Sequence, residues 1–585
     1  MSKHKEDIAM KFFHVYNERC FKGLEKNNLL NEDSAFKIQH VFSMPKEIKF
    51  NEFAAKGSKL HSLIKENNIP FYVDRIAGGV TYHEYDFDPD LIREYESILG
   101  DWFLGFQHHE SASNMAEGVW PRLVNVMGGN EGPYDLEELK EKMLCKVSMD
   151  DGTPLYRFAH GTPEYFANQH LAKSPEEFIE QMRDIYKVMM DRTLGHILPC
   201  DSYHMLSKMQ LEMGMNTLMP EVGWQISDMR IAVATARGMA EAFGKRWGTY
   251  YETWIAAPTE YDASMPCFND DPINEWYLTQ EQHGDDFTTH GHAGGSSRLL
   301  QKRIYYYSLM SGADYLAEEW GLNCSYTSME TFDLSPYGLV KKEFIDFARN
   351  YKTVKAKIPF AIVLPLEYAA VQLHNPFRPY GIGQFKERYL NYPIPDSQRD
   401  FNGHIEDVLK LAYVTYGNKY GNEGHVMTNS RFGDLFDIIY EDASDEVFAK
   451  YDALIDASPD GRFAAKKGDK YKVFESSNLE KLESDLRAAE KEAMPCTVDK
   501  LHWLVSGDAD GRRYLSVFNN EGNYRMRPVG DTIDNAADTT VTVTFKGAAD
   551  INPIKLSAEG VKIHKVDEKT YKIDIPAAQF AIVEF

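Results

Sequence analysis

Two short apolar runs each end with glutamate and tryptophan: Gly-Lys-Arg-Trp-Gly-Thr-Tyr-Tyr-Glu-Thr-Trp, residues 244–254, and Gly-Ala-Asp-Tyr-Leu-Ala-Glu-Glu-Trp-Gly, residues 312–321. Both are predicted strands, and the apolar periodicity of residues 297–311 predicts a helix between them. Strand, loop, helix and strand in this order is the unit of a parallel α/β fold. In a barrel of such units, the C-terminal strand ends carry the chemistry.

The same alternation runs through residues 36–355. Further strands are predicted at 36–42, 69–77, 102–107, 155–159, 197–200 and 216–219, separated by helical segments. Residues 1–35 are predicted to form a helical lead-in, because Ile8, Phe12, Phe13 and Tyr16 recur at helical spacing. The eight strands predict a (β/α)8 barrel. A doubly wound open sheet is the alternative, but no glycine-rich phosphate loop supports it.

Two smaller domains are predicted after the barrel. Lys357-Ile358-Pro359 marks a boundary, and the short apolar strands that follow, separated by helices, predict a small α/β domain. Beyond Leu501, apolar and polar residues alternate in short runs, which predicts a β-sandwich. The predicted domains are therefore the barrel at 1–355, the α/β domain at 356–498 and the sandwich at 499–585.

The composition narrows the possible partners. A chain of 585 residues with a formal charge of −25 is a poor match for nucleic acid, whose phosphates demand a basic surface. The sequence shows no secretory signal and no apolar run of the roughly 18 residues that span a bilayer. The six cysteines are scattered without a Cys-x-x-Cys pair, which predicts reduced thiols. A cytoplasmic protein without cofactor, membrane or nucleic-acid partner is expected.

The strand-end residues suit the cleavage of sugars. Glycoside hydrolysis uses two carboxyl groups at the scissile bond, and sugars stack on aromatic faces. Glu252, between Tyr251 and Trp254, is one candidate carboxylate, although an ion-pairing or substrate-binding glutamate is the alternative. Glu110, directly after His108-His109, is the second, and Glu164 competes with it because it also follows a predicted strand.

Further residues near the strand ends are predicted to contact the sugar. Since Glu318 and Glu319 are adjacent on a strand, only one of them can point into the barrel mouth. The tryptophans are either stacking platforms or core residues. The predicted substrate-binding residues are Glu221, Trp224, Trp254, Glu318, Glu319, Trp320, His109, Asn114 and Asp201.

Four stretches resemble the β-galactosidases of glycoside hydrolase family 42: Phe-Leu-Gly-Phe-Gln-His-His-Glu at 103–110, residues 244–258, Ser-Gly-Ala-Asp at 311–314, and residues 436–455, which resemble part of its trimerisation domain. The resemblance implies a catalytic barrel, an α/β trimerisation domain and a short β-domain, and hence a homotrimer. It places Glu110 at the family's acid/base and Glu252 at its nucleophile. The resemblance therefore implies a retaining exo-β-glycosidase that acts on short β-linked oligosaccharides, with a β-galactoside or β-mannoside as substrate.

The chain departs from that family's pattern in two respects. His109 stands where the wider clan has asparagine before its acid/base, and Glu110 closes the third predicted strand instead of the fourth. Three-domain β-mannosidases fit the same plan equally well. The cysteine cluster that binds zinc in many family members has no counterpart here.

Two other functions are compatible with the sequence. A metal-dependent barrel hydrolase or isomerase would use Glu221 with Asp285, His290 and His292 from the loop at 283–292, although a loop lining the barrel mouth is the favoured interpretation of that stretch. A sugar-binding barrel without catalysis is the other alternative, because a barrel fold alone does not specify a reaction.

Overall fold

A computed structural model describes most of the chain. The described residues are 9–16, 18–39, 50–77, 86–111, 115, 119–148, 154–156, 161–201, 206–224, 229–253, 295–319, 325–328, 330–367, 396–413, 423–526 and 530–585.

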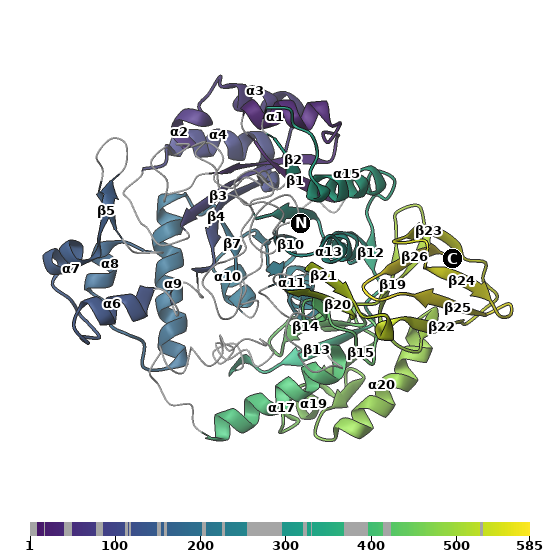
Figure 1. The fold of residues 1–585 in the computed structure, drawn as a ribbon. Coiled ribbons are helices and arrows are strands. Elements are labelled where there is room, and N and C mark those ends of the chain that lie inside the picture. The colour runs from purple at the N-terminus through teal and green to yellow at the C-terminus, as the bar shows by residue number, and fades with distance from the viewer. Residues whose placement is uncertain are drawn as a thin grey trace.

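The first part of the chain is a nearly closed parallel barrel of eight strands (Figure 1). The hydrogen-bonded order is β7-β4-β3-β2-β1-β11-β10-β8, and the short β9 continues the sixth strand and pairs with β10. The amide of Glu221 donates a hydrogen bond to the carbonyl of Asp201 across the closing gap, at 3.2 Å. The strands are β1 (Lys11–Val15), β2 (Ser34–Gln39), β3 (Phe71–Ala77), β4 (Phe103–His109), β7 (Ile197–Cys200), β8 (Thr217–Leu218), β9 (Glu221–Gly223), β10 (Arg246–Glu252) and β11 (Tyr315–Glu318).

Helices cover the outside of the barrel (Figure 1). Several begin at a side-chain cap that satisfies a free amide: Asp88 caps α4, Ser174 caps α9, Ser297 caps α13 and Ser335 caps α15. The outer helices are α1 (Glu18–Lys26), α2 (Phe50–Phe53), α3 (Lys59–Asn67), α4 (Pro89–Leu99), α9 (Pro175–Arg192), α10 (Ser207–Glu212), α11 (Met229–Phe243), α13 (Arg298–Met310) and α15 (Pro336–Ala348).

Between β4 and β7 the chain makes an additional excursion before α9. It contains α6 (Trp120–Val126), α7 (Leu136–Met143), β5 (Leu144–Ser148), β6 (Pro154–Tyr156) and α8 (Pro163–Ala167). The strands β5 and β6 pair with each other in an antiparallel hairpin and not with the barrel.

Two predictions about the barrel strands are wrong. The lead-in contains the first strand, β1, because Phe12 and Phe13 alternate across the sheet: Phe13 packs with Tyr72 and Tyr315 inside the barrel, and Phe12 packs outward. Over so few residues, helical and strand spacing cannot be told apart. The strand predicted at 155–159 is replaced by β6, outside the barrel. Glu110 therefore follows the fourth barrel strand, and Glu252 ends the seventh.

A parallel four-stranded sheet follows, in the order β14-β13-β15-β16. Its strands are β13 (Phe360–Leu364), β14 (Phe436–Tyr440), β15 (Ala453–Asp456) and β16 (Val473–Glu475), with α17 (Asp396–Tyr413), α18 (Asp445–Phe448), α19 (Arg462–Lys467) and α20 (Leu479–Ala493) around them. Helix α11 of the barrel packs on β14, and a Cβ on Gly238 would lie 2.5 Å from the carbonyl oxygen of Ile438.

The C-terminal strands form two antiparallel sheets, β12-β18-β19-β26-β23 and β17-β22-β25-β24. Both include a short strand from before residue 499, namely β12 (Lys355–Ala356) and β17 (Cys496–Val498). The other strands are β18 (His502–Gly507), β19 (Arg513–Phe518), β22 (Thr539–Phe545), β23 (Asn552–Leu556), β24 (Lys562–Lys565), β25 (Thr570–Ile575) and β26 (Phe580–Glu584).

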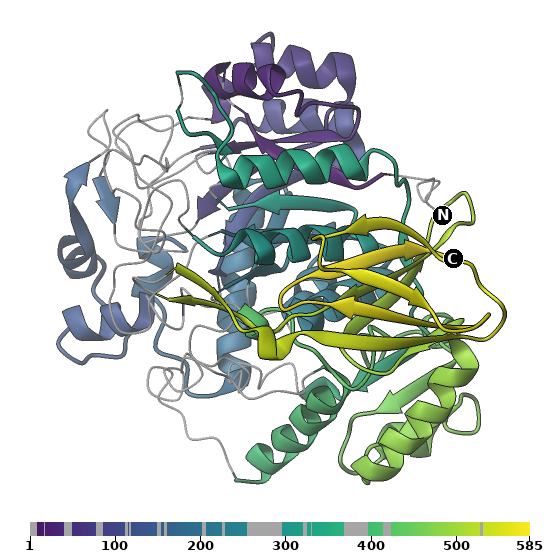
Figure 2. The same ribbon diagram turned by 45° about the vertical axis from the view of Figure 1, so that its right-hand side comes forward.

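A separate hairpin, β20 (Asn523–Met526) and β21 (Gly530–Ile533), extends from these sheets toward the barrel (Figure 2). Arg525 Nε donates to the carbonyl of Gly295 at 2.6 Å, and Asn523 Nδ2 donates to Glu423 Oε2 at 2.7 Å. The hairpin thereby contacts the chain just before α13. None of the helices among the described residues combines the length and apolarity that crossing a bilayer requires.

Candidate active site

A polar layer covers the apolar interior of the barrel at its C-terminal end. The interior cluster includes Ala35, Tyr72, Tyr250 and Ala317 from four strands and Met219 from between β8 and β9. Residues two positions further along a strand point to the same side. The inward-facing residues at the mouth are therefore Lys37, Asp74, Glu221, Glu252 and Glu319.

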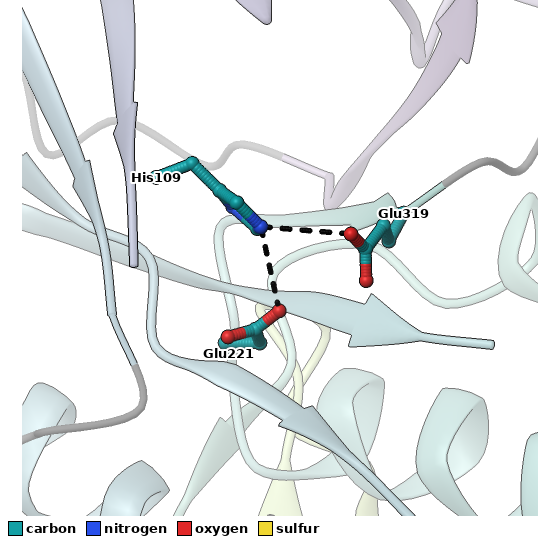
Figure 3. A group of neighbouring side chains, drawn as sticks. All are labelled: His109, Glu221 and Glu319. Atoms are coloured by element: carbon teal, nitrogen blue, oxygen red, sulfur yellow. Dashed lines mark ion pairs between the residues drawn. The ribbon is translucent and has the colours of Figure 1, made fainter. Parts of the chain in front are cut away.

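At the centre of this layer, the imidazole of His109 contacts three carboxylates, two of which, Glu221 and Glu319, are drawn with it in Figure 3. His109 Nε2 lies 3.5 Å from Glu319 Oε1, 3.8 Å from Glu221 Oε1 and 3.8 Å from Glu110 Oε2. His109, Glu221 and Glu319 are each at most 3% exposed. Because His109 comes from the fourth strand and the two buried glutamates come from the sixth and eighth, the imidazole reaches across the barrel interior.

Glu252 lies between the strands that carry those two glutamates. Strand β10 pairs with β9 on one side and β11 on the other, and Glu252 itself is in register with Gly223. The side chain is 1% exposed. A Cβ on Gly223 would lie 2.5 Å from Glu252 Cβ and 3.1 Å from its Oε2, so only glycine leaves room for this carboxylate. Glu252 therefore belongs to the same buried layer as Glu221 and Glu319.

Glu110 occupies the rim above His109. Its backbone has φ = 48°, the left-handed region that side chains rarely adopt, and its amide donates to the carbonyl of Cys200 at 2.7 Å. Strained backbone of this kind is concentrated at functional sites. The side chain is 32% exposed, in contrast to the buried Glu252. The fourth and seventh strands thus present one accessible and one buried carboxylate at the same mouth.

The pKa of the Cys200 thiol reflects the negative charge of this layer. Burial raises its pKa well above the ordinary value, and the charges of Glu221, Asp74, Asp201 and Glu110 raise it further. Four carboxylates from different strands or strand ends therefore act on one buried atom.

The same layer contains a buried ion pair, Lys37 with Asp74. Lys37 Nζ is 3.0 Å from Asp74 Oδ2, donates to the carbonyl of Glu318 at 2.6 Å and lies 5.3 Å from the centre of the Tyr250 ring. Sequence reasoning missed both members of this pair. The available signal was a charged residue inside each of two otherwise apolar strands, Ser-Ala-Phe-Lys-Ile-Gln and Phe-Tyr-Val-Asp.

Strand alternation separates Glu318 from Glu319. Glu318 points outward, where Lys341 Nζ lies 2.5 Å from its Oε2 and the hydroxyl of Tyr337 donates to Oε1 at 2.6 Å. Tyr305 also donates to it. Glu318 thus joins β11 to the surrounding helices, whereas Glu319 faces the imidazole.

The other predicted site residues lie outside the cluster around His109. Trp224 is 3% exposed, with its ring 5.3 Å from that of His425, in an edge-to-face contact between the barrel and the segment after α17. Asp201 accepts from Ser111 Oγ at 3.0 Å. Glu164 is in the first turn of α8, paired with Lys140 at 2.8 Å. Several predicted residues lie outside the described part of the chain: Asn114, Trp254, Trp320, Asp285, His290 and His292.

Comparison with known proteins gives similarity only at the level of structure. No protein-family model and no curated protein matches the sequence. The structure is similar to the catalytic module of a family 98 glycoside hydrolase from Streptococcus pneumoniae, with 11% identity, 99% of each chain covered and a TM-score of 0.39.

Two further solved structures are similar at comparable levels. One is α-L-fucosidase isoenzyme 2 from Paenibacillus thiaminolyticus, with 10% identity, 100% of this chain and 98% of the other covered, and a TM-score of 0.41. The other is GH5_18 from Streptomyces cattleya, with 9% identity, coverage of 81% and 99%, and a TM-score of 0.31. The strand pairing of this chain itself identifies the (β/α)8 barrel.

Proposed function

We propose that the protein is a retaining exo-β-glycosidase that acts on short β-linked oligosaccharides or glycosides, with Glu252 as nucleophile and Glu110 as acid/base. One observation carries the proposal: Glu110 directly follows the fourth barrel strand, Glu252 ends the seventh, and both share a mouth with His109, Glu221 and Glu319. Paired carboxylates at one end of a barrel are the machinery of glycoside hydrolysis.

The burial of the two carboxylates supports their different roles. Glu252 is 1% exposed on a regular strand, where neighbouring strands hold it in a fixed position for attack on the anomeric carbon. Glu110 is 32% exposed at the rim, where a leaving group and then a water molecule have access to it. An acid/base must exchange its proton with both, so the accessible carboxylate suits that role.

The reaction would proceed in two displacements. Glu252 forms a bond to the anomeric carbon while Glu110 protonates the departing glycosidic oxygen. With a β-linked substrate, this step gives an α-linked glycosyl–enzyme. Glu110, now a carboxylate, takes a proton from water, which attacks the anomeric carbon and releases Glu252. The other buried carboxylates of the mouth would favour the positive charge that develops on the sugar ring in both steps.

Contacts to the sugar are proposed for the remaining mouth residues. The carboxylates of Glu221 and Glu319 and the imidazole of His109 line the floor and offer hydrogen-bond acceptors or donors to hydroxyl groups. Trp254 and Trp320 follow β10 and β11 closely in the sequence and are proposed stacking platforms. The resemblance to three-domain β-glycosidases favours a β-galactoside or a β-mannoside and a trimer, and the scattered cysteines favour the cytoplasm.

A screen of 4-nitrophenyl α- and β-glycosides tests the proposal. Wild type should hydrolyse one β-glycoside, and Glu252→Ala should lose this activity and recover turnover with azide, giving the α-glycosyl azide. Glu110→Ala with azide should give the β-glycosyl azide instead. Glu164→Ala is the matched control, since Glu164 is paired on α8, and it should keep the wild-type rate.

Other outcomes would assign the roles of nucleophile and acid/base to different residues. Full activity in Glu252→Ala would move the nucleophile to Glu221 or Glu319. Loss of activity in Glu164→Ala together with an active Glu110→Ala would restore Glu164 as the acid/base. If no glycoside is turned over while a sugar still binds, the barrel is a binding protein.

A further inference from the structure

We propose that His109, Glu221 and Glu319 form a binding site for a first-row divalent cation, Mn²⁺ or Zn²⁺, at the floor of the barrel mouth. The site is independent of the proposed glycosidase activity, because it is argued from the spacing and charge of these three side chains. Figure 3 shows the imidazole nitrogen and both carboxylates directed at one another.

The spacing of the donor atoms matches a shared ion. One donor atom from each residue lies within 4.8 Å of the other two, and His109 Nε2 is 3.5 Å from Glu319 Oε1 and 3.8 Å from Glu221 Oε1. Nitrogen and oxygen donors that surround Zn²⁺ tetrahedrally, each at ~2.1 Å, are about 3.4 Å apart. Contraction of the three donors toward this spacing would bring them to coordination distance.

The site is built on rigid elements. His109 ends β4, Glu221 begins β9 and Glu319 directly follows β11, so three strands of one hydrogen-bonded sheet fix the donors. All three side chains are buried. Strand-borne ligands of this kind are held more precisely than ligands on loops, which lowers the cost of binding an ion.

The charge of the surrounding layer is a second observation that favours a cation. Asp74, Glu221, Glu252 and Glu319 are each at most 3% exposed. Among the described residues of this layer, the basic side chains are Lys37 and His109, and Lys37 is already paired with Asp74.

Asp74 adds an unsatisfied acceptor to this layer. Its Oδ1 is buried and has no hydrogen-bond partner within the described part of the chain, while its Oδ2 takes the ammonium of Lys37. Burying carboxylates in excess of cations is costly, and a bound dication offsets that cost.

The donor set indicates the class of ion. One imidazole nitrogen and two carboxylate oxygens suit Zn²⁺ or Mn²⁺, whereas Ca²⁺ prefers six to eight oxygens. Three protein ligands leave at least one position open for water or for a hydroxyl group of a bound sugar. The rival explanation is that His109 is an imidazolium and is itself the balancing cation.

Equilibrium dialysis of chelator-treated full-length protein against MnCl2 or ZnCl2, followed by elemental analysis, separates the two explanations. At about pH 7.5, where the ligands are deprotonated, wild type should bind one equivalent of one of these ions. His109→Gln and Glu319→Gln should weaken binding by at least about 100-fold, since loss of outer contacts alone costs 10–100-fold.

Glu252→Gln is the matched control, because it removes a buried carboxylate of the same layer that lies outside the trio. It should weaken binding far less than His109→Gln does, even if it abolishes hydrolysis, so failure of the cation site and failure of the glycosidase assignment are distinguishable. Equal weakening in Glu252→Gln and His109→Gln would contradict the proposal, as would wild type that takes up neither ion.

A crystallographic measurement avoids reliance on variants that fold poorly. Wild-type crystals soaked in MnCl2 or ZnCl2 should show an anomalous scattering peak between His109 Nε2 and the carboxylates of Glu221 and Glu319. Absence of a peak at this position in both soaks would overturn the assignment.

Discussion

The two ends of the barrel differ in how their charges are arranged. A cavity of about 810 Å³ lies at the N-terminal base, between the barrel and the parallel sheet that follows it. Two ion pairs lie in its lining: Arg237 with Asp437 at 2.6 Å, and Lys450 with Glu241. At the C-terminal mouth, several carboxylates instead converge on the single imidazole of His109.

This difference shows that cavity volume is a weaker guide to function here than charge arrangement. Paired charges are a stable structural solution and need no ligand. Buried carboxylates that share one imidazole raise the energy of the empty site, and a reacting sugar or a cation relieves it. Chemistry is therefore expected at the mouth and not at the base.

The largest expected effect on activity comes from removing the carboxylate of Glu252. Glu252→Ala should lower kcat on the preferred aryl glycoside by on the order of 10⁴-fold, because covalent catalysis loses its nucleophile. Lys450→Ala, at the base, should stay within about twofold of wild type, a change too small to reflect lost transition-state contacts. Steady-state kinetics on both variants checks the comparison, and equal losses would contradict it.

The same contrast between a paired charge and a charge of the site holds for Glu318 and Glu319, adjacent residues that point to opposite faces of the sheet. Glu318→Gln leaves Lys341 as a buried ammonium without its carboxylate and should lower the free energy of unfolding by about 3–5 kcal/mol. Glu319→Gln should change that free energy much less and should instead reduce kcat/KM. Urea denaturation and kinetics on the same preparations measure both quantities. The reverse pattern would mean that Glu318 is the residue of the site.

Replacing Gly223 tests how closely the mouth is packed around Glu252, the proposed nucleophile. Gly223→Ala places a Cβ 2.5 Å from Glu252 Cβ, so the carboxylate must move, and a displacement of about 1 Å costs on the order of 10²-fold in rate. Gly403→Ala is the control, because a Cβ at that position meets nothing within 4 Å. Wild-type kinetics in Gly223→Ala would show that Glu252 has no fixed position to lose.

The last prediction concerns a histidine outside both regions. Burial, followed by the charge of Lys341, lowers the pKa of His14 to about 3 from 6.5. Between those pH values the unfolded chain binds a proton that the native protein excludes, so stability rises with pH by about 1.4 kcal/mol per unit. The contribution of His14 to the free energy of unfolding is therefore fully present above pH ~6.5 and is lost as the pH drops toward 3.

His14→Gln removes this titration. Its unfolding free energy, measured in urea across that pH range, should decline on acidification with a slope smaller by one proton than that of wild type. An unchanged slope would show that His14 is protonated in the native protein.

Much of the fold was predictable because barrel strands have a local signature. The runs that end at Glu252 and Glu319 are apolar, short and followed by carboxylates, and the structure places both at the mouth. Strand β1 was missed because five residues, Lys-Phe-Phe-His-Val, carry too little periodicity to distinguish a strand from a helix.

The arrangement of the site was less accessible from sequence. Lys37 and Asp74 meet only because β2 and β3 are neighbours, and the contacts of His109 with Glu221 and Glu319 join strands far apart in the chain. No local pattern encodes such contacts. Alternation did predict that Glu318 and Glu319 point to opposite faces, although not which of them faces inward.

The most direct test of the account is to identify the residue that becomes covalently linked to sugar. Wild type incubated with a 2-deoxy-2-fluoro glycoside of the preferred sugar should gain the mass of one glycosyl group, and peptide mapping should locate it on Glu252. A label on Glu221, Glu319 or a residue at the base, or hydrolysis of the parent glycoside without any trapped intermediate, would contradict the account.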